Sequence, residues 1–120
     1  MSVGIIGGSV SPSTALTLNA QTGTTYTFVL TDANNTLVTA SNASAQTYTI
    51  PPNSSVAYPV GAQINIIQIG AGQVSFAQGS GVTIASAGAT STAPKLRVQY
   101  SSASAIKVAT DTWYVIGDIA

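Results

Sequence analysis

The sequence contains no histidine, no cysteine and no glutamate, and only six of its 120 residues are charged. Most general acid–base, nucleophilic and metal chemistry in proteins uses the missing residue types. We therefore expect no catalytic residue, no metal ligand and no cofactor, and we predict that the protein is not an enzyme. The absence of cysteine also excludes a disulfide framework.

The scarcity of charge also limits the partners of the protein. Charged residues make up 5% of the chain, against about 25% in an ordinary soluble domain, and the formal net charge is zero. Nucleic-acid binding needs a cluster of Lys and Arg, whereas Lys95 and Arg97 form only a local pair. The N-terminus has no basic segment typical of a secretory signal, and no apolar run is long enough for a membrane span. We expect neither nucleic acid nor membrane as a partner.

Short alternating runs of apolar and polar residues fill most of the chain. The alternation is clearest at Tyr26, Phe28 and Leu30, which we expect to share the buried face of one strand. The glycine-rich connections at residues 70–72 and 78–81 predict a series of hairpins. The sequence therefore predicts an all-β fold: a single β-sandwich or barrel-like module of roughly eight to ten short strands.

The two ends of the chain differ. Residues 1–20 are predicted to form an irregular N-terminal arm and a first strand, and residues 21–120 the β-sandwich module. The C-terminal part carries three further predicted strands, at 96–100, 104–108 and 113–116. In the last of these, alternation places Trp113 and Val115 on one face, with their neighbours Tyr114 and Ile116 on the other.

Two pairs of residues near the C-terminus allow a functional interpretation. Trp113 and Tyr114 suit a platform that stacks on sugars, but large aromatics dominate core and interface burial in small domains. We therefore favour one ring in the core and the other against a neighbouring subunit. Asp111 and Asp118 supply the two carboxylates that a glycosidase needs. We favour turn-forming roles, because aspartate readily bonds its own backbone.

Two other segments carry weaker signals. Asp32, Asn34 and Asn35 offer oxygen ligands for Ca²⁺, but the run lacks the glutamate and the alternating spacing of a calcium loop. We predict a turn there. Residues 4–8 are glycine-rich like a phosphate loop, but no lysine follows them. We predict that they belong to a flexible apolar arm.

Four segments together resemble a β-module that recurs in virion proteins of tailed bacteriophages. They are IPPNSSVAYPVGAQI (50–64), QIGAGQVSF (68–76), KLRVQYS (95–101) and DTWYVIGDI (111–119). The resemblance covers residues 24–119. The module occurs at the ends of tail fibres and in small capsid decoration proteins, so it implies a structural part of the virion.

We expect a capsid decoration (cement) protein that binds the major capsid protein on the capsid exterior as a homo-trimer and stabilises the shell. The chain opens with Met1, and we expect it to be complete, whereas a fibre tip usually ends a much longer polypeptide. The alternative is a receptor-binding tail-fibre or spike tip that recognises host surface glycans. Candidate residues for the subunit or capsid interface are Val3, Ile5, Ile6, Val10 and Tyr114.

Overall fold

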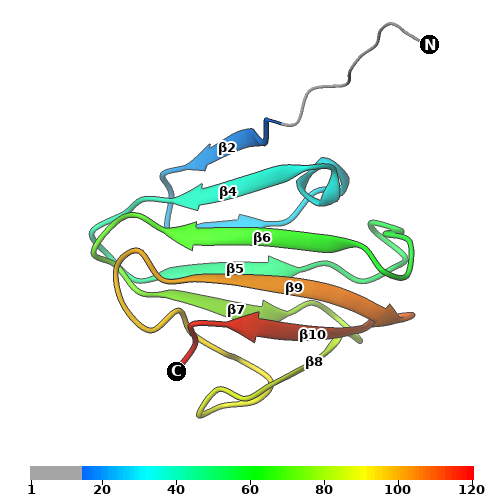
Figure 1. Cartoon of the computed structure of the whole chain (residues 1–120). Coiled ribbons are helices and arrows are strands. Elements are labelled where there is room, and N and C mark those ends of the chain that lie inside the picture. The colour runs from blue at the N-terminus through cyan, green and yellow to red at the C-terminus, as the bar shows by residue number, and fades with distance from the viewer. Residues whose placement is uncertain (1–14) are drawn as a thin grey trace, which may run out of the picture.

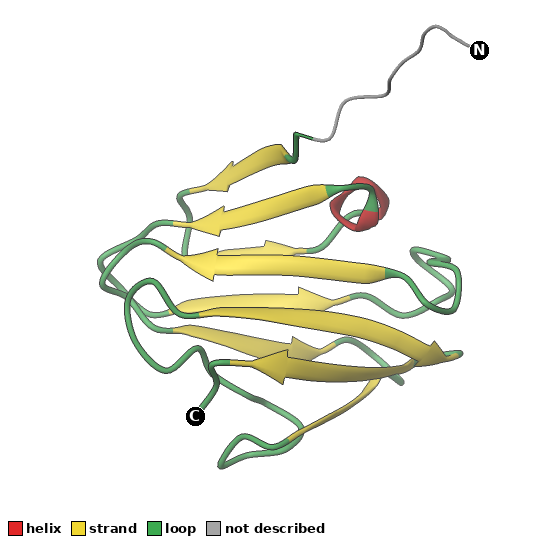
Figure 2. Cartoon of the chain, in the orientation of Figure 1, coloured by secondary structure: helices red, strands yellow, loops and turns green. Residues whose placement is uncertain are grey.

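The computed structural model describes residues 15–120, which form nine strands in two sheets (Figures 1 and 2). In spatial order, the six-stranded sheet contains β2 (Thr17–Gln21), β4 (Thr36–Ala40), β6 (Gln63–Gln68), β9 (Ser102–Ala109), β10 (Thr112–Gly117) and β8 (Thr83–Ser86). The three-stranded sheet contains β3 (Thr25–Thr27), β5 (Gln46–Ile50) and β7 (Val74–Gln78). One 3₁₀ turn, η1 (Leu30–Ala33), precedes β4. The predicted all-β fold and its number of strands are confirmed.

The chain alternates between the two sheets as it winds. β2, β4 and β6 pair in parallel in one sheet, and β3, β5 and β7 pair in parallel in the other. Each passage through both sheets therefore adds one coil beside the previous coil, as in a short solenoid. The hairpin β9–β10 then inserts between β6 and β8, with β9 antiparallel to β6 and β8 parallel to β10.

The predicted hairpin series is wrong, because the glycine-rich connections cross from one sheet to the other. The connection from β6 to β7 stacks on the connection from β4 to β5, and Gly72 N–H donates to the carbonyl oxygen of Asn42 over 2.8 Å. A Cβ on Gly72 would collide with the carbonyl oxygen of Ser44. Glycine at this position therefore permits two backbones to approach closely and does not mark a reversal within one sheet.

The core lies between the sheets and is filled from both inner faces. Phe28, Tyr48 and Phe76 pack together, with ring centroids 5.7 Å apart for Phe28–Tyr48 and 6.3 Å for Phe28–Phe76. On the side of the hairpin, Trp113 is 1% exposed and meets Tyr58 edge to face. Burial of these rings supplies much of the hydrophobic stabilisation of so small a domain.

Two strand predictions need correction. Leu30 does not share the buried face of Phe28: β3 ends at Thr27, η1 begins at Leu30, and the Leu30 side chain is 53% exposed. Residues 96–100 form no strand. Lys95 and Leu96 make isolated bridges, and the chain then turns, with Tyr100 at φ 70°.

Candidate protein–protein interface

The strands of both sheets carry almost no charge. Among the residues of the nine strands, Lys107 on β9 is the one that carries a charge. Its side chain points inward and is 3% exposed. Both outer surfaces of the sandwich are therefore uncharged along their strands. The other charged residues lie in connections or beyond the last strand.

The outward-facing side chains of the six-stranded sheet, here called the broad face, include large apolar residues. Register places Leu18 beside Leu37, and Tyr114 beside Ile106. The exposed fractions are 67% for Leu18 and 51% for Tyr114. The apolar members of the broad face are Leu18, Leu37, Ile67, Ile106, Val108, Tyr114 and Ile116. Five inter-strand spacings of about 4.8 Å make this face about 24 Å wide.

The centre of the broad face is polar and internally satisfied. Ser104 Oγ donates to Asn65 Oδ1 over 2.6 Å, and Gln63 Nε2 donates to the same oxygen over 2.9 Å. This polar centre separates two apolar patches. The first patch, Leu18 and Leu37, lies on β2 and β4, and the second, Ile106, Val108, Tyr114 and Ile116, lies on β9 and β10.

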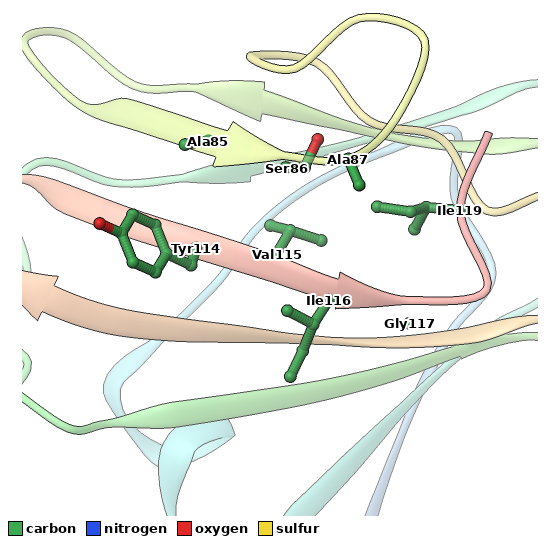
Figure 3. A pocket seen from close by; sticks show the side chains of 8 residues that line it. All are labelled: Ala85, Ser86, Ala87, Tyr114, Val115, Ile116, Gly117 and Ile119. Carbon is green, nitrogen blue, oxygen red and sulfur yellow. The ribbon is translucent and has the colours of Figure 1, made fainter.

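A pocket of about 430 Å³ adjoins the second patch, at the edge formed by β8 and β10 (Figure 3). Figure 3 shows the lining side chains coming from β8, from β10 and from the C-terminal segment. They are Ala85, Ser86, Ala87, Tyr114, Val115, Ile116, Gly117 and Ile119. The lining is mainly aliphatic and contains no charged residue, so the pocket suits an apolar side chain of a partner better than a sugar or an ion.

The outer surface of the three-stranded sheet is chemically different. Register aligns Thr25, Thr47 and Ser75 in one row, and Thr27, Thr49 and Ala77 in the next. We call these six residues the threonine face. Its side chains are small and mostly hydroxylated, so water can solvate this surface at low cost.

Charged side chains outside the strands are largely paired. Arg97 Nε and Asp118 Oδ1 form an ion pair of 2.7 Å. Hydrogen bonds from Arg97 and then from the Ser101 hydroxyl hold the pKa of Asp118 below its usual value. Because Arg97 is paired in this way, Lys95 and Arg97 do not form a basic patch.

The predicted turn at Asp32 is confirmed, and the carboxylate of Asp32 accepts hydrogen bonds from within the protein. Asp32 Oδ2 accepts hydrogen bonds from the Tyr26 hydroxyl over 2.7 Å and from the Val29 backbone over 2.9 Å, and Oδ1 accepts from Asn19 over 2.8 Å. The carboxylate thus ties β2, β3 and η1 together. Burial and the bond to Asp32 raise the pKa of Tyr26 to about 12.

The aromatic and acidic pairs near the C-terminus occupy structural positions. Trp113 packs in the core and Tyr114 points outward, so the two rings do not form one platform. Asp111 and Asp118 lie at opposite ends of β10. At about 3.3 Å per residue their backbones are about 23 Å apart, whereas glycosidase carboxylates lie about 5–10 Å apart. Sequence reasoning identified Tyr114 as an interface candidate but missed Leu18, Leu37 and the other outward aliphatics, because alternation does not say which face is inner.

The remaining interface candidates, Val3, Ile5, Ile6 and Val10, lie outside the described residues, as do the glycine-rich residues 4–8. Within residues 15–120, no group of three or more acidic, histidine or cysteine residues is placed to hold a metal ion. The same part of the chain contains no helix long and apolar enough to span a membrane. No protein-family model, no curated protein and no solved structure matches the chain.

Proposed function

We propose that this chain is a capsid decoration protein of a tailed bacteriophage, bound to the major capsid protein on the outside of the shell as a homo-trimer. The observation that carries the proposal is the broad face. It presents an extended, uncharged surface with two exposed apolar patches on a domain that has its own buried core. Exposed apolar patches of this kind mark protein contacts, because monomeric soluble proteins rarely leave them open to water.

The arrangement of the two apolar patches supports a closed ring. They lie on opposite sides of the polar centre at Gln63, Asn65 and Ser104. In a three-fold assembly, one surface of each copy meets a different surface of the next copy. The patch at Leu18 of one copy can therefore pack against the patch at Tyr114 of its neighbour.

The lack of charge supports a role on a particle with many copies. Interfaces are depleted of charged residues at their centres, and contacts without charge do not weaken at high salt. Decoration would stabilise the shell additively, through small contacts repeated at every capsomer junction. The resemblance of residues 24–119 to phage virion modules favours the same assignment.

A receptor-binding fibre tip is the competing function, and the geometry gives it less support. A sugar site needs an exposed aromatic ring with hydrogen-bonding groups around it. Trp113 is buried, and the pocket beside Tyr114 offers mainly aliphatic side chains. Hydrogen bonding to a glycan would therefore be poor at this position.

The copy number per purified virion tests the proposal. Quantitative mass spectrometry should find hundreds of copies per particle, and a few to a few tens would instead identify a fibre component.

Binding to undecorated capsids gives a second test. Deleting residues 2–11 should weaken binding, because it removes the aliphatics at 3, 5, 6 and 10, and should leave the far-ultraviolet spectrum of the β-module unchanged. Equal binding by both forms would remove the arm from the interface.

A further inference from the structure

Lys107 is the buried cation of this domain, and a contribution to folding stability does not explain why a lysine is buried here. Its Nζ donates to Asn53 Oδ1 and to the carbonyl oxygen of Tyr58, both over 2.6 Å. Among the described residues, its side chain makes no ion pair. Burying an ammonium group without a carboxylate partner costs several kcal/mol in general, so an apolar residue would serve the core better.

The surroundings hold the two side chains together, with Lys107 buried and Asn53 partly buried. The backbone N–H of Asn53 donates to Asp111 Oδ1 over 2.7 Å, which fixes Asn53 against the turn between β9 and β10. Trp113 lies opposite Lys107 in the register of these strands and packs edge to face on Tyr58, with centroids 5.2 Å apart. Tyr58 and Trp113 are 3% and 1% exposed.

We propose that Lys107 and Asn53 join in a spontaneous intramolecular isopeptide bond. The distance from Nζ to Oδ1 is 2.6 Å. Because the carbonyl bond is about 1.2 Å long, the amide carbon Cγ lies within about 4 Å of Nζ. This is close to the separation of about 3–3.5 Å from which positioned groups react.

The reaction needs no other reagent. Lysine nitrogen is an established nucleophile toward carbonyl carbon. Nζ must first lose one proton of its ammonium group, because an ammonium nitrogen has no lone pair. It then attacks Cγ of Asn53, the new Cγ–Nζ bond forms, and the Cγ–Nδ2 bond breaks. The ammonium group of Lys107 gives up two protons, and the departing nitrogen takes them up and leaves as ammonium. Asp111 acts as a positioning residue through its bond to the Asn53 backbone.

The bond would join two distant parts of the chain. Residues 53 and 107 are 54 positions apart, in the β5–β6 connection and in β9. A covalent closure of this length restricts the unfolded chain as a disulfide does. A protein without cysteine would gain a permanent brace between the solenoid coils and the hairpin. This inference does not depend on the proposed function.

The intact mass of the purified wild-type protein under denaturing conditions tests the bond directly. We expect a mass lower than the sequence mass by one ammonia, about 17 Da. A protein that carries the full sequence mass overturns the proposal. An Asn53 succinimide would lose the same mass without using Lys107, so matched variants are needed.

Lys107→Arg and Asn53→Ala should both restore the full mass expected for each variant. Lys95→Arg is the matched control, because it makes the same chemical change at an exposed lysine, and it should keep the loss of ammonia. Ammonia loss that persists in Lys107→Arg would overturn the proposal, since the mass change would then arise elsewhere.

Trypsin supplies an independent readout of the same bond. The sequence has three cleavage sites, after Lys95, Arg97 and Lys107. A modified Lys107 resists cleavage, so peptide 98–107 should be absent. Residues 98–120 should instead appear as one branch attached to peptide 1–95. A full yield of free peptide 98–107 from the denatured protein would exclude the bond.

Discussion

The two outer surfaces of the sandwich have the same strand geometry and the same lack of charge, but different side chains. The broad face exposes Leu18, Tyr114 and Ile116 to solvent by 67%, 51% and 56%. The threonine face presents Thr25 and Thr47 in aligned rows and carries no large apolar side chain. One sheet therefore presents small, mostly hydroxylated side chains to solvent, and the other presents large apolar side chains.

This difference separates the residues that the fold requires from those that it does not require. Both inner faces contribute to a single core, and the core needs only the inward residues of each strand. The fold therefore does not require the leucine at position 18 or the isoleucine at position 116. Their presence on one outer surface and their absence from the other are consistent with a partner on the broad face.

The prediction with the largest expected effect compares the loss of a core side chain with the loss of an exposed side chain nearby. Phe28→Ala should destabilise the protein by about 3–5 kcal/mol, because it leaves a cavity among buried rings. Leu30→Ala, two residues away and 53% exposed, should cost less than about 1 kcal/mol. Urea unfolding measures both. Equal losses would mean that the boundary between core and surface is misplaced at this point.

The sequence predicted which residues alternate but not how the strands pair. Period-two alternation is the same in parallel and antiparallel strands, so it could not show that β5 pairs with β7 in parallel, 28 residues further on. The turn at 110–111 was predictable because its short polar connection returns directly into β10. Gly72 was misinterpreted because a glycine required by stacked backbones looks the same in sequence as a glycine required by a hairpin.

The candidate interface was only partly predictable. Alternation separated Tyr114 from Trp113 correctly, since one of two adjacent strand residues must face outward. Leu18 was missed because an aliphatic residue in a strand is ordinarily assigned to the core. Lys107 was missed for the opposite reason: lysine in a strand is ordinarily assigned to solvent, and its two acceptors lie 49 and 54 positions away.

An effect of intermediate size tests the core beneath the threonine face. Burial raises the pKa of Tyr48 to about 12, and the pKa of Tyr26 is raised similarly. The unfolded chain releases these protons from about pH 10, whereas the native state retains them until about pH 12. Stability should therefore be full below about pH 10 and fall above it, by up to about 1.4 kcal/mol per pH unit for each tyrosine.

Urea unfolding at a series of pH values from 8 to about 11.5 measures this loss. Tyr48→Phe should make the alkaline decline less steep, because it removes one titrating group, and its hydroxyl makes only a long bond of 3.5 Å to Gln46. An unchanged slope in the variant would mean that Tyr48 is accessible to water.

The smallest effect on folding is expected from charges placed on the outer surfaces. Ile116→Lys on the broad face and Thr47→Lys on the threonine face each replace an exposed side chain. At a protein concentration low enough for every form to be monomeric, each should change the unfolding free energy by no more than about 0.5 kcal/mol. A much larger loss in either variant would show that the position supports the core.

Sedimentation velocity of these two variants and of the wild type, at tens of micromolar, tests most directly whether the broad face is a protein contact. The chain mass is 12.0 kDa, so a trimer has three times that mass, about 36 kDa. We predict that the wild type and Thr47→Lys sediment as trimers and that Ile116→Lys sediments as a monomer. A monomeric wild type, or a trimer that Ile116→Lys leaves intact and Thr47→Lys disrupts, would contradict the account.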